Sequence, residues 1–183
     1  MTDDAVRPGA GFLTFLDRLL RPLEMAGLAI SVALMLLVMV LISMDALMRY
    51  LFKAPLTFQF QLTEDYLLVG LVMMGLAWSF RTGGYIRISG LVSLLPHAVV
   101  NPVFRIGLLL SAGYIGAAAW MTGRKFLQLF RSGEAVIGVV DWPVYMSWIW
   151  LPVGLGLLTL RLILVALGPV EDLDIAHDDL DEL

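Results

Sequence analysis

Charged residues divide the chain into apolar stretches whose lengths match helices that cross a bilayer. The three clearest have 20, 18 and 19 uncharged residues and lie at 25–44, 106–123 and 142–160. At 1.5 Å per residue they extend about 27 to 30 Å, close to the thickness of the hydrocarbon core. Each is therefore predicted to be a transmembrane helix. Arg161 is expected to snorkel to a headgroup while the last helix continues through 162–167.

A fourth span is shorter by the same measure. Only the 15 residues 66–80 lie between Asp65 and Arg81, so the helix must begin near 56–61 to cross. That start draws Glu64 and Asp65 toward the membrane edge, where an unpaired carboxylate is costly. The four spans are then expected at about 25–45, 60–80, 104–123 and 143–166. The predicted fold class is an all-α integral membrane protein with four transmembrane helices and short interfacial amphipathic helices.

Three flanking segments are apolar but interrupted by charge. Residues 12–23 repeat apolar side chains with a period near 3.6, which predicts either an amphipathic helix in the interface or an extension of the first span into water. Residues 86–95 predict a short surface-lying helix that stops at Pro96. Residues 125–131 either extend the third span or lie among the headgroups. The late start of the first apolar run argues against a cleaved signal peptide.

Composition agrees with a membrane protein. Apolar residues make up 60% of the chain and charged residues 15%, against about 25% charged in an average soluble domain. A soluble core of this size could not bury so much apolar surface. The net charge of −4 is an effect of 168–183, an acidic segment without Lys or Arg that is expected to be a disordered tail. The expected organisation is an N-terminal segment 1–24, a membrane domain 25–167 and this tail.

The distribution of Lys and Arg predicts the orientation by a small margin. If the N terminus is cytoplasmic, seven basic residues fall on that side of the four spans and five on the other. Cytoplasmic loops carry the excess of positive charge. We therefore expect a multi-pass protein of the bacterial or archaeal inner membrane with both termini in the cytoplasm.

Candidate redox, metal and catalytic residues are scarce. Cysteine is absent, and the two histidines, His97 and His177, lie outside the predicted spans. Neither an intramembrane haem nor a zinc site is therefore expected. The sequence contains no G-x-S-x-G, phosphate-binding glycine loop or H-E-x-x-H motif. We expect no enzymatic activity, no cofactor and no nucleic-acid partner.

The predicted spans also lack a path for a polar solute. Apart from backbone and aromatic side chains, the first, third and fourth offer only the hydroxyl groups of a few Ser and Thr residues: Ser31, Ser43, Ser111, Thr122, Ser147 and Thr159. A channel or carrier needs polar or ionisable groups across the bilayer. The pattern therefore favours a scaffold or accessory subunit.

One charged cluster is predicted at the first hairpin. Asp45 and Arg49 share a helix face, and a turn at Pro55 would bring Glu64 and Asp65 close to Arg49. We interpret a pairing of Arg49 with either acid as a structural clasp, with contact to an ion or substrate as the alternative. Charge reversal at Arg49 is then expected to abolish assembly or stable expression.

Small residues predict close helix packing in the third span. Gly113 pairs with Ala117 and Ala112 with Gly116 at a spacing of four. Such pairs let helix backbones approach closely in lipid. Packing within the bundle is the favoured interpretation, and an interface with a partner is the alternative.

The order of several motifs carries a family resemblance. The segments are Arg49-Tyr50-x-Phe52-x-x-Pro55, Phe58, Glu64, Gly75, Trp78, Arg81, Gly83-Gly84-Tyr85-Ile86-Arg87-Ile88, Gly133-Glu134, Asp141-Trp142-Pro143 and Trp150-Leu151-Pro152-Val153-Gly154. Together they resemble the DctQ-like small membrane subunit of TRAP (tripartite ATP-independent periplasmic) transporters. Tyr85, Ser89 and Phe58 stand where that family often has histidine, an acid and tryptophan.

The resemblance implies an accessory role in transport. Such a subunit binds a large multi-span TRAP membrane subunit, which imports an organic acid with sodium after a periplasmic substrate-binding protein delivers it. Membrane lipids are further expected partners. The alternative is a non-catalytic membrane anchor or assembly subunit of another membrane complex, such as a respiratory enzyme.

Overall fold

The structure is a computed structural model that describes residues 10–82, 97–136 and 142–168. Its elements, in chain order, are α1 (Ala10–Phe52), α2 (Thr57–Leu62), the π-helical turn η1 (Thr63–Leu67), α3 (Leu68–Arg81), α5 (His97–Ser132), β1 (Ala135–Val136), β2 (Trp142–Pro143), α6 (Tyr145–Trp148) and α7 (Trp150–Leu167). The two-residue strands pair antiparallel, with Ala135 opposite Pro143. The expected surface helix at 86–95, which includes Arg87, lies outside the described residues.

Four helical stretches of the described chain are long and apolar enough to cross a membrane. They are Phe15–Phe52, Thr57–Arg81, Pro102–Ser132 and Tyr145–Leu167. This confirms the predicted fold class. The second stretch begins at Thr57 because α2, η1 and α3 continue one into the next, so the helix starts before the two acids of the second span.

The helices extend further than the apolar runs. With 43 residues, α1 is about 64 Å long. Residues 12–23 are continuous with the first span, and Pro22 does not interrupt the helix. This segment therefore extends the first span and is not a separate interfacial helix. In the same way α5 continues through 125–131 to Ser132.

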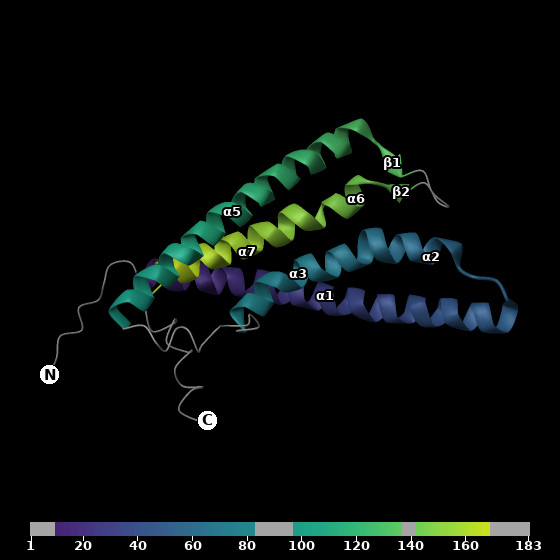
Figure 1. Cartoon of the computed structure of the whole chain (residues 1–183), viewed down its shortest axis with the longest axis horizontal. Coiled ribbons are helices and arrows are strands. Elements are labelled where there is room, and N and C mark those ends of the chain that lie inside the picture. The colour runs from purple at the N-terminus through teal and green to yellow at the C-terminus, as the bar shows by residue number, and fades with distance from the viewer. Residues whose placement is uncertain (1–9, 83–96, 137–141, 169–183) are drawn as a thin grey trace, which may run out of the picture.

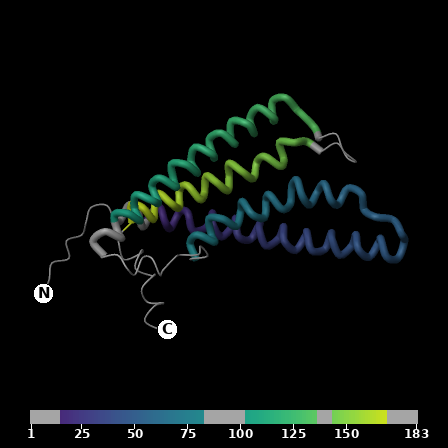
Figure 2. Tube along the Cα trace, viewed as in Figure 1, coloured from purple at the N-terminus to yellow at the C-terminus, as the bar shows by residue number. Residues whose placement is uncertain are grey.

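In the view of Figure 1 the four long helices form a row that spreads toward one end like a fan. In Figure 1, α5, α7, α3 and α1 follow one another across the molecule, and each packs on its neighbour in that order. At one end α1 also contacts α7. The trace in Figure 2 shows the hairpin of α1 and α3 diverging from that of α5 and α7 toward the opposite end. The start of α1 and the end of α7 lie together at the closed end, as an even number of spans requires.

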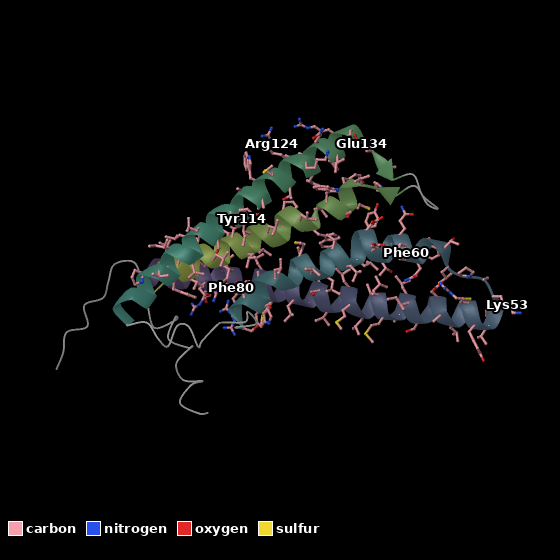
Figure 3. The ribbon with its side chains drawn as sticks, viewed as in Figure 1. Lys53, Phe60, Phe80, Tyr114, Arg124 and Glu134 are labelled. Carbon is pink, nitrogen blue, oxygen red and sulfur yellow. The ribbon has the colours of Figure 1, made fainter. Side chains whose placement is uncertain are left out.

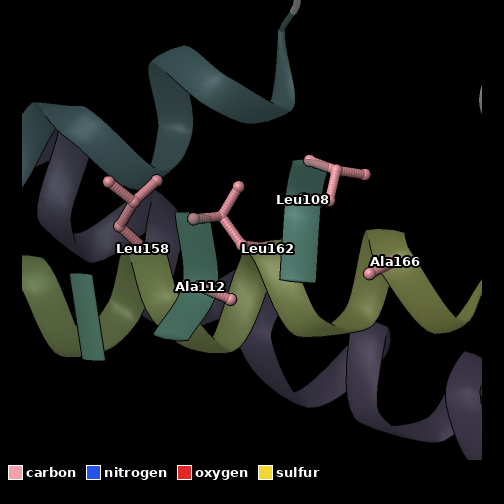
Figure 4. Close-up of a cluster of buried hydrophobic side chains, with 5 residues drawn as sticks. All are labelled: Leu108, Ala112, Leu158, Leu162 and Ala166. Atoms are coloured by element: carbon pink, nitrogen blue, oxygen red, sulfur yellow. The ribbon is translucent and has the colours of Figure 1, made fainter. Parts of the chain in front are cut away.

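Apolar packing joins α5 to α7. The buried cluster contains Leu108 and Ala112 from α5 and Leu158, Leu162 and Ala166 from α7 (Figure 4). The four-residue spacing within each set places them on one face of its helix. By contrast, α1 and α5, at the two edges of the row, expose many large apolar side chains, as expected for surfaces that contact lipid or a partner.

Candidate functional site

Four charged side chains from three helices meet at the closed end of the fan. The guanidinium of Arg81, at the end of α3, donates to Glu24 Oε2 at 2.7 Å and to Asp17 Oδ2 at 3.1 Å, both on α1. Arg161 of α7 donates to Asp17 Oδ1, and its Nε lies 3.8 Å from Glu24 Oε1. The cluster therefore links α1, α3 and α7 through residues up to 144 positions apart.

Burial makes the charges of this ion cluster costly in free energy unless they are compensated. Glu24 is only 1% exposed, and the side chains of Arg81 and Arg161 are largely covered. A charge in such surroundings is tolerated when opposite charges and hydrogen bonds compensate its lost hydration. Two carboxylates and two guanidinium groups give the cluster no net charge. Its geometry suits a lock between helices.

The position of Arg161 corrects one expectation from the sequence. Arg161 does not snorkel to a headgroup as a single residue: its side chain is 15% exposed and pairs with Asp17 and Glu24. These two acids lie seven residues apart, two helical turns, so both face α3 and α7. The reason is that α1 continues beyond its apolar run and supplies carboxylates at the level of Arg161.

At the open end of α1, the structure corrects the predicted clasp. Arg49 Nη2 donates to Asp45 Oδ2 at 2.7 Å, one turn away on the same helix. Asp45 Oδ1 accepts the backbone N–H of Leu56 at 2.8 Å and so holds the turn that leads into α2. In the described part of the chain, no ion pair joins Arg49 to Glu64 or Asp65. Asp45 therefore holds this turn.

Asp45 is expected to matter more for stability than Arg49. Replacing Asp45 by alanine leaves the Leu56 N–H without its acceptor, which we expect to lower the free energy of unfolding by about 1 to 3 kcal/mol. Arg49→Gln removes a pair whose arginine side chain is 67% exposed, so we expect a loss of at most about 1 kcal/mol. Unfolding of the purified protein in mixed micelles measures both. Equal losses would contradict this assignment.

Two contacts connect the hairpins toward the open end. The Tyr66 hydroxyl in η1 donates to the backbone carbonyl of Pro143 at 3.3 Å, and the Ser147 hydroxyl donates to the carbonyl of Asp65. The motif segments around Glu64 and around Trp142-Pro143 therefore lie next to each other. Glu64 and Asp65 have exposed side chains.

The remaining predicted residues are separated in space. Tyr50 is strongly exposed near the end of α1, and Pro55 lies in the loop before α2. Gly116 faces α7, where an added Cβ would lie 3.2 Å from the Thr159 methyl group, whereas a Cβ at Gly113 would meet nothing within 4 Å. Ala117 is exposed like Gly113. Packing within the bundle therefore uses Ala112 and Gly116, and the pair Gly113/Ala117 faces outward.

The sequence pattern predicted no role for the four residues of the buried ion cluster together. Arg81 marked only the limit of an apolar run, and Asp17 falls within the stretch 12–23 that was predicted to be amphipathic. The available signal was the seven-residue spacing of Asp17 and Glu24 and the presence of Arg161 within an apolar helix. Among the described residues, no group of three or more Asp, Glu or His side chains could hold a metal ion.

Comparison with known proteins places the chain in a family. The family described as "Tripartite ATP-independent periplasmic transporters, DctQ component" matches residues 38–171, well over half of the 183 residues. The match includes the first hairpin with Asp45 and Arg49, η1, and α7 with Arg161. No curated protein matches the chain. The chain thus belongs to the DctQ family and is a small membrane subunit of a TRAP transporter.

Proposed function

We propose that this subunit braces a sodium-coupled TRAP transporter and does not itself conduct the substrate. The substrate is an organic acid that a periplasmic binding protein delivers to the large multi-span subunit. The buried ion cluster of Asp17, Glu24, Arg81 and Arg161 is the observation that carries the proposal. The charged groups that are buried where α1, α3 and α7 meet pair with one another and so fix these helices together.

The hydroxyl groups of the spans support the same role. Ser31 Oγ donates to the Leu71 carbonyl at 2.8 Å and so joins α1 to α3. Thr122 and Thr159 donate to carbonyls one turn earlier in their own helices, at 2.8 and 2.7 Å. A polar group that is already bonded within the protein offers little to a passing solute. These side chains stabilise helices.

The shape of the subunit also suits a brace. The ion cluster fastens one end of the fan, and the bonds from Tyr66 and Ser147 connect its hairpins toward the other. The row between them has a broad apolar surface on α1. A wide row of helices that are bonded to one another can hold a larger membrane subunit in place while that subunit's transport domain moves.

Localisation and orientation complete the proposal. We place the subunit in the cytoplasmic membrane with both termini in the cytoplasm, which the small excess of Lys and Arg on that side supports. The large subunit contacts it within the membrane. The binding protein acts on the opposite, periplasmic side.

Co-purification tests the assembly. A tag on this chain is expected to retrieve a large multi-span permease from a mild detergent extract at a ratio of one to one. Proteoliposomes that contain the complex, the binding protein and a sodium gradient are then expected to take up the organic acid. Retrieval of the subunits of a respiratory enzyme, without a permease, would contradict the proposal.

A further inference from the structure

The outward face of α5 carries basic side chains near its C-terminal end. Arg124, Lys125 and Arg131 are exposed, and among the described residues no ion pair joins any of them to a carboxylate. Arg124 projects from the side of α5 that faces away from α7 (Figure 3). Every ion pair that joins two helices of the described chain lies at the closed end, so these cations do not hold the bundle together.

Two of these cations line a groove on one helix face. Arg124 and Arg131 lie seven residues apart, two turns, with Gln128 between them. The open groove has a volume of about 530 Å³ and is lined by Arg124, Leu127, Gln128, Arg131 and Ser132. Two guanidinium groups, an amide and a hydroxyl offer several hydrogen-bond donors to one anion. Guanidinium groups bind phosphate oxygens in bidentate pairs.

An apolar strip continues from the groove toward the middle of the helix. Trp120, one turn before Arg124, is 72% exposed, and Leu110 and Tyr114 farther along the same side are 70% and 80% exposed. Between these large side chains lies Gly113, where an added Cβ would meet nothing within 4 Å. The face thus combines a shallow apolar track with a cationic end.

The depth of the groove fits the membrane interface. The uncharged run 106–123 extends about 27 Å, nearly the thickness of the hydrocarbon core, and it ends directly before Arg124. From Arg124 to Arg131 the helix rises about 10 Å, which is comparable with the headgroup layer. Trp120 then lies at the boundary, where tryptophan is enriched.

We propose that this face binds one anionic phospholipid. Its phosphate lies between Arg124 and Arg131, and one acyl chain follows α5 past Trp120 toward Gly113. An acidic surface of a soluble protein would match the cations but not the apolar strip that continues into the membrane. This inference goes beyond the bracing role and does not depend on it.

Binding can be followed through Trp120. The full chain, and the complex retrieved with it, are placed in nanodiscs of phosphatidylcholine with increasing phosphatidylglycerol whose chains carry bromine, which quenches tryptophan. Subtraction of the same titration with Trp120→Phe isolates the signal of this residue. We expect saturable quenching by phosphatidylglycerol. Arg124→Gln should weaken binding about fivefold and Arg124→Gln/Arg131→Gln about thirtyfold, because each substitution removes a guanidinium group that binds the phosphate.

Lys125 provides the matched control. It is exposed and adjacent to Arg124 but does not line the groove, so Lys125→Gln changes the same charge at the same depth. We expect this variant to weaken binding less than threefold. A loss equal to that of Arg124→Gln would mean general attraction to an anionic surface and would overturn the proposal.

Two further outcomes would also overturn it. Competition by millimolar inorganic phosphate would identify a site for the free anion. Protection of Trp120 from brominated lipid in the complex, but not in the chain alone, would assign the face to a partner helix.

Discussion

Replacing Glu24 by glutamine is expected to destabilise the protein by about 3 to 5 kcal/mol, because it leaves Arg81 and Arg161 as buried cations with too little compensating charge. Glu24 is 1% exposed and accepts a hydrogen bond from Arg81 at 2.7 Å. Water therefore cannot reach this position to replace the lost negative charge. Unfolding of the purified chain in mixed micelles, followed by far-UV circular dichroism, measures the change. Reduced recovery from membranes is expected as well.

Two further variants separate the cluster from a general effect of charge. Arg18→Gln removes an exposed cation of the same helix that makes no ion pair among the described residues, and we expect a change within about 0.5 kcal/mol. Glu24→Gln combined with Arg81→Gln leaves the neutral pair of Asp17 and Arg161. This double variant should be at least about 1 kcal/mol more stable than the sum of the single losses. Additive losses, or wild-type stability of Glu24→Gln, would show that the cluster does not lock the helices.

Substitution of Gly154 by valine is expected to separate α3 from α7. An added Cβ at this position would lie 2.3 Å from the Met73 carbonyl oxygen and 2.7 Å from its carbon, both backbone atoms. The side chain cannot rotate away from this obstacle, so the helices must move. We expect a loss of about 3 kcal/mol in the same unfolding assay, at the upper end for overpacking.

Gly156 is the control for Gly154. It lies two residues further along α7, and an added Cβ there would meet nothing within 4 Å. Gly156→Val introduces the same side chain into the same helix and should leave stability within about 0.5 kcal/mol of the wild type. Similar losses at both positions would point to an effect on the helix itself and would argue against close contact between α3 and α7.

The number and class of the helices could be predicted because the bilayer fixes their minimum length. Stretches such as 25–44 are uncharged for about 30 Å, and no soluble arrangement requires that. Helix ends could not be predicted in this way. α1 continues to Ala10 past four charged residues because two of them, Asp17 and Glu24, pair with α3 and α7. Charge ends an apolar run, but it does not by itself end a helix.

The sites were harder to predict for a related reason. Arg49 was expected to pair across the hairpin, yet the acid four residues earlier on its own helix is nearer and needs no particular turn. The partners of Arg161 are set by the packing of α1 beside α7, which single-sequence periodicity does not contain. Helix packing also decides which small residues of α5 face inward. Gly116 lies against Thr159 of α7, and Gly113 does not.

Uptake into liposomes tests whether the subunit supports transport without performing it. The radiolabelled organic acid that the intact transporter takes up is offered, with a sodium gradient and the binding protein, to liposomes that contain this chain alone, the large subunit alone or both. We predict that this chain alone gives no uptake above protein-free liposomes, and that its addition to the large subunit restores full uptake. Sodium-driven uptake by this chain alone would show instead that the subunit itself transports the substrate.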